Sequence, residues 1–441
     1  RPVPGIEYRG KTPSIMEARR ARAAQKIAQI EVWRTRLRQV ALFAAILISG
    51  GLLIIPRPPL LLIVLVICFL LKNPLRVFKS EFAGIWLLLA ATVAVALIGG
   101  ESFQLGPLTI RLANFLAAIA LLLLYIDERP GKISSDLFPI LFLMAFQAIL
   151  TPIVEKLIPQ FFWTFQVHDT TYQTFLYIFN FHEFVAGATF FKRPDGFFFE
   201  PGVLQMYLNI LVFICLFVRR FSPWQIGVAT LGVLSTQSTT GVAILTLQYV
   251  VAYLRWVKIA DRGKKLVVLV LAPILLVPIA LYATVNFADK VYGEGSGSAE
   301  ARKYDLRTGL SVVREKPLTG IGFDYEKYFD LAAQVGYREA ELSLENITDR
   351  SNSNGVVTLL YSVGIPLSLV FLLGLFRQRL FRPRLLFSMI ILLSSFSEAL
   401  LLNPMLLLIL FSGLLIKPAK KPDLRPKSPM ARQHGSRLRP A

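Results

Sequence analysis

The chain has 441 residues, of which 54% are hydrophobic and only 17% are charged, and its mean hydropathy is +0.56. These values exclude an ordinary soluble globular domain of this size, in which about a quarter of the residues are charged. The formal net charge of +20 would suggest nucleic acid in a soluble protein, but the Lys and Arg residues stand beside apolar runs, where they orient helices in a bilayer. The sequence therefore predicts a polytopic protein whose partner is the lipid bilayer and not nucleic acid.

The amino-terminal segment, residues 1–39, is strongly basic, with ten Lys and Arg against three Asp and Glu. Within it, Ile27, Ile30 and Trp33 recur at helical spacing. This pattern is typical of a basic amphipathic helix that lies on anionic lipid, and a solvated, disordered arm is the alternative. In either case we expect residues 1–39 to lie in the cytoplasm.

Apolar runs recur from residue 40 to residue 416, and a helix needs roughly 20 apolar residues to cross a bilayer. They predict about twelve transmembrane helices, with ten to thirteen as the range because some runs are short. The runs lie at 40–56, 59–72, 82–99, 110–126, 137–154, 203–218, 223–234, 240–256, 265–285, 355–375, 384–400 and 402–416. The predicted fold class is an all-α membrane protein, with a transmembrane domain over residues 40–416 and a basic cytoplasmic tail over residues 417–441.

The basic linkers between these runs predict the direction of the chain. If the amino terminus is cytoplasmic, every strongly basic short loop falls on the same side, as the positive-inside rule requires. The opposite side then receives two long loops, residues 155–202 and 286–354, and the second holds twelve acidic against nine basic residues. Connections between packed helices are usually a few residues long, so we expect these extracytoplasmic loops to carry function.

Each long loop has its own pattern. The larger one has Leu306, Leu310 and Val313 at helical spacing, which predicts a helix over residues 300–315, and a second helix is expected over residues 325–335. The smaller loop is rich in Phe, Tyr and Trp, which indicates a segment that lies in the membrane interface, where aromatic rings are favoured.

Charged residues at the end of the smaller loop are the first candidates for chemistry. Arg193 and Glu200 stand just before the sixth apolar run, where a charge is costly unless it faces water, a partner or a ligand. In the functional interpretation Arg193 binds phosphate oxygens through its planar guanidinium and Glu200 acts as a base. In the alternative interpretation these two side chains pair with each other. His182 and Glu183 form a further polar pair that would lie near a ligand.

The larger loop offers a second cationic group. Arg302, Tyr304 and Arg307 share about one turn of the predicted helix, although Arg302 and Asp305 are three residues apart and an ion pair between them is the alternative. Arg314 and Lys316 look like ordinary solvated charges. Ser353 and Asn354 directly precede the tenth apolar run, and their commonest use at such a position is to cap the helix.

Metal and cofactor chemistry find no support in the sequence. Cys68 and Cys215 both lie inside apolar runs, and the few histidines have no second ligand at useful spacing. No phosphate-binding glycine loop follows a strand, so neither a cofactor nor a cytoplasmic nucleotide-sugar donor is expected. Glu398, near the end of the eleventh run, is interpreted as a polar contact within the bundle, although a transporter would use such a residue.

Between residues 190 and 375 the order of these features resembles the O-antigen polymerase and O-antigen ligase superfamily. Arg193 with the Gly-Phe and Glu-Pro elements up to Gly202 looks like the superfamily's arginine before a span, and residues 235–241 look like its break between paired helices. Arg302 followed by residues 316–322 is similar to its Arg-led helix that ends in a Pro-Leu-Leu-Gly-x-Gly turn.

The resemblance continues at Ser353-Asn354, with Gly364 eleven residues after Ser353, where many members have His-Asn and then a glycine. Two departures stand out. Thr240 occupies a position where the break often has Arg, and Ser353 occupies the position of the ligase histidine. Because that histidine is considered important in ligases, the resemblance favours the polymerase branch.

The resemblance implies a GT-C-like membrane glycosyltransferase in the bacterial inner membrane, with its active site on the extracytoplasmic side. Such an enzyme joins repeat units carried on polyprenyl diphosphate, such as undecaprenyl diphosphate, into O-antigen, capsule or exopolysaccharide, inverting the anomeric centre without a metal. Donor and acceptor would both be polyprenyl-diphosphate-linked glycans, and a chain-length regulator is left open as a partner. The expected catalytic residues are Glu200, Arg193 and Arg302, and the expected substrate-binding residues are Arg307, Lys192, Tyr304, Ser353, Asn354, Glu183 and His182.

Two other functions stay open from the sequence. A ligase would transfer a finished glycan to lipid A core or to a protein. A lipid-linked oligosaccharide flippase or other transporter would move its substrate without making a bond. Such proteins commonly show internal repeats and charges near the membrane midplane, whereas this sequence shows no persuasive repeat and little midplane charge.

Overall fold

A computed structural model of the chain describes residues 15–50, 56–99, 105–129, 131–167, 170–182, 192–219, 222–259, 296–334 and 352–416, with positions 281, 284 and 288. The helices are α1 (Ile15–Gly50), α2 (Arg57–Leu71), α3 (Ala83–Gly99), α4 (Leu105–Tyr125), α5 (Lys132–Leu157), α6 (Pro201–Phe213), α7 (Pro223–Ser235), α8 (Thr239–Ile259), α10 (Ser296–Glu315), α11 (Tyr325–Gln334), α12 (Gly355–Arg377), α13 (Arg384–Ser395) and α14 (Pro404–Leu414). Short 3-10 turns precede α3 and follow α5, and a π-helical turn, Ile214–Val218, extends α6. The strands are β1 (Trp163–Val167), β2 (Thr170–Phe175) and β3 (Phe179–His182).

Helices dominate this part of the chain, and the predicted apolar runs fall on them, except for the run at 265–285, most of which lies outside the described residues. Six helices are long and apolar enough to cross a membrane by length and composition, while α2, α13 and α14 are apolar but shorter. The chain is therefore a largely helical membrane protein. The count of twelve spans, the two extracytoplasmic loops and the GT-C-like architecture stay predictions.

Prolines and asparagines explain several helix starts. Proline is the first residue of α6, α7 and α14, where its missing N–H would have no helical partner in any case. The side chain of Asn354 accepts hydrogen bonds from the backbone N–H groups of Val356 and Val357, as expected for a helix cap. At its other boundaries the structure differs from the predicted runs: α1 passes through residue 39 without a break, and α13 ends at Ser395, five residues before the predicted span does.

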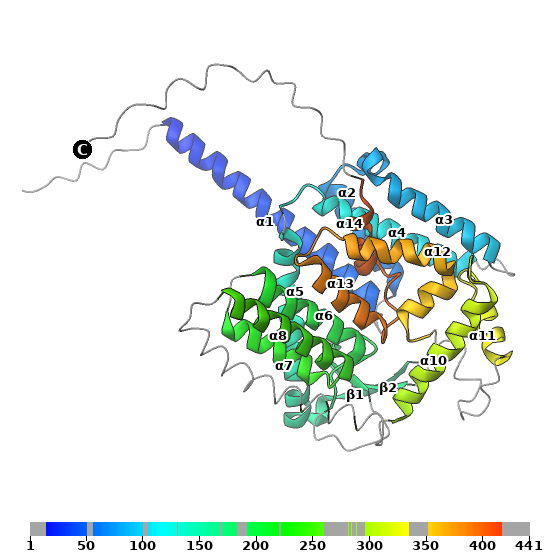
Figure 1. Cartoon of the computed structure of the whole chain (residues 1–441). Coiled ribbons are helices and arrows are strands. Elements are labelled where there is room, and N and C mark those ends of the chain that lie inside the picture. The colour runs from blue at the N-terminus through cyan, green and yellow to red at the C-terminus, as the bar shows by residue number, and fades with distance from the viewer. Residues whose placement is uncertain are drawn as a thin grey trace, which may run out of the picture.

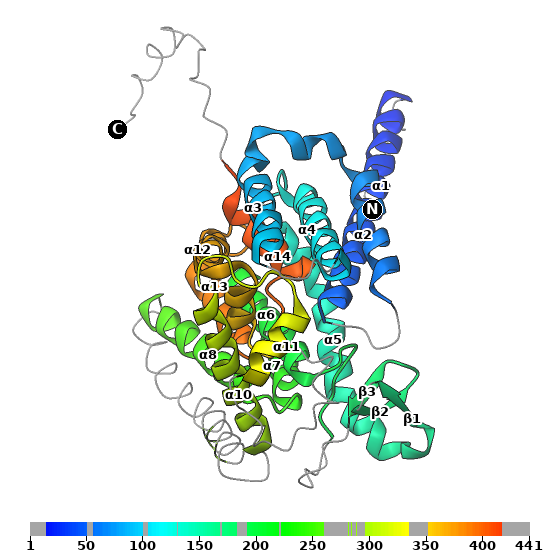
Figure 2. The same ribbon diagram turned by 90° about the vertical axis from the view of Figure 1, so that its right-hand side faces the viewer.

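The bundle has two different ends, which both views separate clearly (Figures 1 and 2). We call the end that carries the sheet, α10 and the start of α12 the loop end. The opposite end, with the amino-terminal half of α1 and the linkers 72–82, 126–132 and 378–383, is called the basic end. Successive helices run back and forth between these ends, so residues far apart in sequence meet at each.

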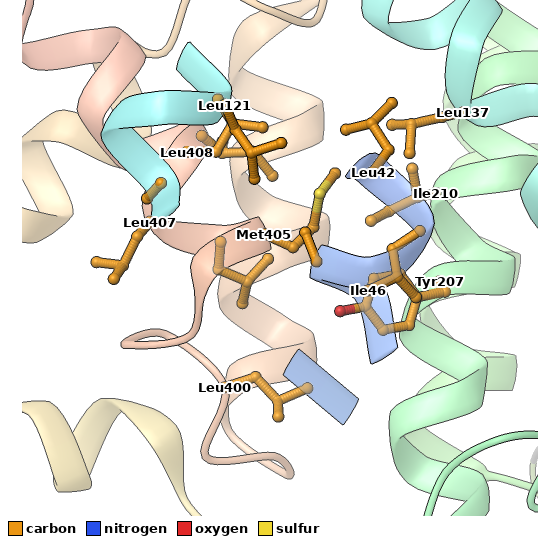
Figure 3. Close-up of a cluster of buried hydrophobic side chains, with 14 of the residues drawn as sticks. Leu42, Ile46, Leu121, Leu137, Tyr207, Ile210, Leu400, Met405, Leu407 and Leu408 are labelled. Atoms are coloured by element: carbon orange, nitrogen blue, oxygen red, sulfur yellow. The ribbon is translucent and has the colours of Figure 1, made fainter. Parts of the chain in front are cut away.

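Apolar side chains from five helices fill the centre of the bundle. Figure 3 shows Ile46 of α1 beside Tyr207 of α6, with Met405 and Leu408 of α14 close by and Leu121 of α4 above them. All five side chains are at most 1% exposed. Within a membrane such packing fixes helix positions through van der Waals contacts, since lipid is as apolar as the core. At the start of α14, Asn403 donates a 2.8 Å hydrogen bond to the Ser49 carbonyl, which ties α1 to α14 at the loop end.

The smaller loop contains a three-stranded antiparallel sheet, which the sequence analysis did not predict. Strand β2 lies in the middle, with Phe165 opposite Tyr172 in β1 and Tyr172 opposite His182 in β3. Aromatic and β-branched residues favour strands because they pack well across a pleated surface. The aromatic content that indicated an interfacial segment is thus also what builds a sheet, and the sheet carries the first residues of the candidate site.

Candidate active site

The turn that precedes α6 is fixed by the last strand of the sheet. The Asp195 N–H donates to the Asn180 carbonyl at 2.9 Å, and the Asn180 side chain donates to the Gly196 carbonyl at 2.7 Å. Gly196 has a φ of +67°, a conformation that glycine adopts without steric cost. Below the turn, the Tyr172 hydroxyl donates to the Phe199 carbonyl at 3.0 Å. The residues from Lys192 to Glu200 are therefore held in one place by β2 and β3.

A histidine and a buried aspartate meet at this turn. The Nδ1 atom of His182 lies 2.9 Å from both carboxylate oxygens of Asp195, and the Asp195 side chain is fully buried. Burial raises the pKa of Asp195 to about 6, although the hydrogen bond from His182 and the charge of Arg193 act in the opposite direction. A carboxylate that receives Nδ1–H leaves Nε2 as the basic ring atom, which is how aspartate orients a catalytic imidazole. The sequence predicted a polar pair of His182 and Glu183, and Glu183 lies outside the described residues.

Arg193 reaches the break between two helices. Its Nε atom donates a 3.2 Å hydrogen bond to the carbonyl of Thr236, which lies in the short break between α7 and α8. The ion pairs of the described residues do not include the Arg193–Glu200 pair considered from the sequence. Just after the break, Gly241 packs so closely on Gln205 of α6 that an added Cβ would lie 3.0 Å from the Gln205 Cβ. The arginine turn, the helix break and α6 therefore form one unit.

Glu200 stands at the start of α6, and a second carboxylate lies beside it in the fold. The Glu200 carbonyl accepts the 3.2 Å hydrogen bond from Val203 that opens the helix, and its side chain is half-buried. Glu398, only 4% exposed, packs on Gly202, because a Cβ at Gly202 would lie 1.8 Å from the Glu398 carboxylate. The Glu398 carbonyl is similarly close to Gly355 at the start of α12. Glu398 therefore fills the space between the amino-terminal ends of α6 and α12, as a polar contact inside the bundle.

The start of α12 holds the helix that carries Arg302. The Ser353 N–H donates to the Asp305 carboxylate at 2.9 Å, its hydroxyl donates to the same oxygen, and Asn352 donates to the Tyr328 hydroxyl at 3.1 Å. Asp305 thus accepts hydrogen bonds from Ser353 and does not form the ion pair with Arg302 that the sequence left open. Ser353 joins α12 to α10, while Asn354 caps α12.

The remaining candidate cations lie around these two groups. Arg302 is half-buried on α10, one turn before Asp305, and Arg307 is exposed on the same helix. Tyr304 is half-buried between them. In the turn before α6, the Lys192 ammonium lies 5.7 Å from the centre of the Phe181 ring. A cation at this distance from a ring face is attracted by the ring quadrupole.

The end of α10 docks into a kink of α12. The Ile321 N–H donates to the Tyr361 carbonyl at 2.7 Å, and the Ile365 N–H donates to the Pro317 carbonyl at 2.8 Å. Gly320 and Gly364 have φ angles of +65° and +75°. A Cβ on Gly364 would lie 2.2 Å from the Leu318 carbonyl oxygen, so the backbone of α12 packs directly on the backbone of the turn after α10. The two glycine features of the family resemblance are therefore the two halves of one joint, which sets the position of Arg302.

Two cations of the site were missed or misjudged from the sequence. Lys316, interpreted as a solvated charge, donates a 2.9 Å hydrogen bond to the Gly99 carbonyl and so ties the α10 turn to the end of α3. Arg111 of α4 lies 5.8 Å from the centre of the Phe323 ring, directly after that turn. A lone arginine near the start of an apolar run was the available signal. Arg314, by contrast, is exposed as expected.

Metal ligands do not gather in the part of the chain that the structure describes, where no group of three or more His, Cys, Asp and Glu side chains is arranged to hold a metal ion. The arrangement can instead perform acid–base chemistry beside cations. His182, Asp195 and Glu200 can accept or donate protons, and arginines from the two long loops can stabilise negative charge.

Comparisons with known proteins found one family. The family model described as O-antigen ligase matches residues 226–372, which cover α7, α8, α10, α11 and most of α12. The comparisons with curated proteins and with solved structures found no match. The matched stretch includes the helix break, the α10 turn and the Gly364 kink, and it confirms the resemblance drawn from the sequence. Residues 226–372 are thus similar to the O-antigen ligase family, which supports the likeness of this helical membrane protein to the O-antigen ligase and polymerase superfamily.

Proposed function

We propose that this protein is a glycosyltransferase that polymerises polyprenyl-diphosphate-linked repeat units at the outer face of the inner membrane. The observation that carries the proposal is that the four features of the superfamily are joined at the loop end in two bonded pairs, one formed by the Arg193 turn with the α7–α8 break and the other by α10 with α12. Arg193 bonds to the α7–α8 break, Ser353 bonds to α10, and residues 317–321 bond to the Gly364 kink. A substrate bound there would meet all four at once.

The cations serve the leaving group. When the acceptor hydroxyl oxygen attacks the anomeric carbon of the donor, the bond from that carbon to the diphosphate oxygen breaks and its electron pair stays on the diphosphate. Arg193 and Arg302 stabilise this charge, because guanidinium groups bind phosphate oxygens in pairs and stay protonated. Lys192, Arg307 and Tyr304 hold the remaining polar groups of the diphosphate-linked sugar. The donor enters from the bilayer, where its polyprenyl chain stays.

The acceptor must lose a proton in the same step. Glu200, exposed enough to reach a hydroxyl at the start of α6, is one base for this proton. The His182–Asp195 pair is the second, and its geometry favours it because the buried Asp195 fixes the imidazole from one side. The attack leads to inversion at the anomeric carbon. The residues named here perform these steps with their own protons and charges.

A polymerase activity is preferred to a ligase activity because position 353 holds a serine. The serine there is engaged with Asp305, and its hydroxyl cannot replace the imidazole that ligases carry at this position. A transporter is the third alternative. Glu398 would be its natural charged residue, but this carboxylate lies between helix ends at the loop end and not halfway along a helix.

The basic end supports the proposed direction in the membrane. It gathers the basic amino-terminal half of α1 and the basic linkers, so it would face the cytoplasm by the positive-inside rule. The loop end, with the candidate site, would then face outward, where flipped lipid-linked repeats arrive. A regulator of chain length would act from that side.

The deciding experiment uses the purified full chain in lipid vesicles with a lipid-linked repeat unit as sole substrate. A polymerase produces a ladder of longer lipid-linked glycans and releases the polyprenyl diphosphate. A ligase produces new bonds only when lipid A core or an acceptor protein is added. Movement of the labelled repeat across the vesicle membrane without any new glycosidic bond would refute the glycosyltransferase proposal.

A further inference from the structure

A cavity of about 410 Å³ opens at the basic end, on the other side of the bundle from the candidate active site. Three arginines line it together with the last residues of α14, namely Arg377, Arg379, Arg384, Gly413, Leu414, Leu415 and Ile416. They come from the end of α12, the linker after it and the first residue of α13. The chain thus brings three guanidinium groups to one opening.

Hydrogen bonds and close backbone packing define the walls of the cavity. The Arg379 N–H donates to the Ser412 hydroxyl at 3.1 Å, and its guanidinium Nη2 donates to the Leu415 carbonyl at 2.5 Å. Close packing of Gly413 against the carbonyl of Gly374, where an added Cβ would lie 2.0 Å away, holds the end of α14 beside α12. The cavity therefore keeps its shape through backbone contacts.

The positive charge in this cavity is not neutralised by the described residues. None of the ion pairs among them includes Arg377, Arg379 or Arg384. Burial lowers the pKa of Arg379, and the positive charge of Arg384 lowers it further because the two cations repel each other. Both side chains nevertheless stay protonated, as arginine does in proteins. Arg38 of α1 differs from these arginines, since it has two carboxylate partners, Asp136 and Glu128. Clustered guanidinium groups without acids favour an anion with several oxygens.

The surroundings indicate an anion attached to an apolar chain. Ile416 lines the cavity and is 51% exposed, and next to Arg384 the side chain of Leu385 is 63% exposed. Met389, four residues later on the same helix face, is also exposed. An apolar strip that begins at a cationic cavity fits a lipid, with the acyl chain on α13 and the head group among the arginines.

We propose that this cavity is a binding site for a phosphate group, and that an anionic phospholipid of the cytoplasmic leaflet supplies it. A free phosphate compound has the same oxygen chemistry and is the other source to be tested. The site would tie α12, α13 and α14 to the membrane surface at the end opposite the candidate active site, and it does not depend on the proposed glycosyltransferase function.

The test compares Arg384→Gln with Arg382→Gln in the full chain. Both arginines are exposed and lie two residues apart, but only Arg384 lines the cavity. Each variant therefore loses one positive charge, and only Arg384→Gln loses it from the cavity. Protein is delipidated and reconstituted in phosphatidylcholine nanodiscs with a small fraction of phosphatidylglycerol, and retained phosphatidylglycerol is measured by native mass spectrometry. A second arm measures the thermal unfolding midpoint with and without inorganic phosphate.

We expect the wild type and Arg382→Gln to retain phosphatidylglycerol and Arg384→Gln to retain roughly tenfold less. If inorganic phosphate raises the unfolding midpoint of the wild type and Arg382→Gln alone, without selective lipid retention, the phosphate site stands and its ligand is soluble. Equal behaviour of the two variants in both arms overturns the proposal. Arg377→Gln replaces Arg384→Gln if the latter does not fold, and the same outcomes apply.

Discussion

Charged side chains near the two ends of the bundle differ in their partners. At the basic end, Arg38 pairs with Asp136 at 3.0 Å and with Glu128 at 3.6 Å, and Lys132 also pairs with Asp136 at 3.0 Å. We call these four residues the α1–α5 charge cluster. At the loop end, Arg193 donates to a backbone carbonyl and Asp305 accepts from a serine.

The difference separates structural charges from functional ones. A buried network of mutually paired charges is complete within the protein and holds helices together. In the proposed function, Arg193 and Arg302 act on the substrate instead. The comparison predicts that charge removal affects stability in the α1–α5 charge cluster and catalysis at the candidate active site.

The largest effect is expected for Asp136→Ala in the α1–α5 charge cluster. Its carboxylate is 1% exposed and accepts from Arg38, Lys132 and Tyr125, so its removal leaves the buried Arg38 with only the longer Glu128 pair and takes the carboxylate away from Lys132. We expect a loss of about 3–5 kcal/mol in the free energy of unfolding. Denaturation in detergent followed by tryptophan fluorescence measures it, with Glu31→Ala on exposed α1 as the control. A loss as small as that of the control would break the comparison.

At the loop end, Arg193→Ala and Arg302→Ala should reduce kcat/KM for repeat-unit transfer by roughly 100- to 1000-fold, because each removes a cation that stabilises the leaving diphosphate. Stability should change little for Arg302, whose side chain has no ion pair among the described residues. Arg314→Ala is the matched control, since Arg314 is exposed on the same helix. If all three variants make wild-type glycan ladders, the arginines are not part of the site.

His182→Gln should lower the transfer rate by roughly 100-fold if the imidazole is the base. The rate of the wild type should also fall as the pH drops through about 6, the raised pKa of Asp195, because a protonated Asp195 no longer receives Nδ1–H and Nε2 then carries the proton. The measurement is a pH–rate profile of wild type and Asp195→Asn. A full loss in Glu200→Gln combined with an unchanged profile in Asp195→Asn would assign the base to Glu200.

A smaller, mixed effect is expected for Gly364→Ala. The new Cβ would meet the Leu318 carbonyl and the φ of +75° is unfavourable for alanine, which together cost about 1–3 kcal/mol. Because this joint positions α10, the transfer rate should fall as well. Gly227→Ala is the control, since nothing lies within 4 Å of a Cβ there and alanine favours the helix. Equal unfolding midpoints for the two variants would show that the joint is not tightly packed.

Local patterns predicted most of the helices, because apolar runs and the Leu306 spacing depend on neighbours in sequence. The α10 and α11 helices and the α7–α8 break lie where the sequence placed them. Arg193, Arg302 and Glu200 could be selected as candidates because charge beside an apolar run is unusual. The family match includes Arg302, whereas Arg193 and Glu200 precede it in the chain.

Contacts between distant segments could not be predicted in the same way. The His182–Asp195 pair depends on the register of β2 and β3, and the sheet itself was hidden by an aromatic content that also suits the membrane interface. Whether Asp305 bonds to Arg302 or to Ser353 is decided by the packing of α10 on α12. The Lys316–Gly99 bond joins residues 217 positions apart, and no local pattern signals it.

The central claim is that Arg193 and Arg302 act on the same diphosphate, and a double-mutant cycle tests it most directly. Arg193→Lys and Arg302→Lys keep the charge but lose the paired geometry of the guanidinium, so each variant should stay measurable. The transfer rates of the wild type, both single variants and the double variant are compared on one lipid-linked repeat. We predict a coupling of about 0.5–3 kcal/mol between the two positions. Strictly additive losses would contradict the account, since they would mean that the two arginines act at separate places.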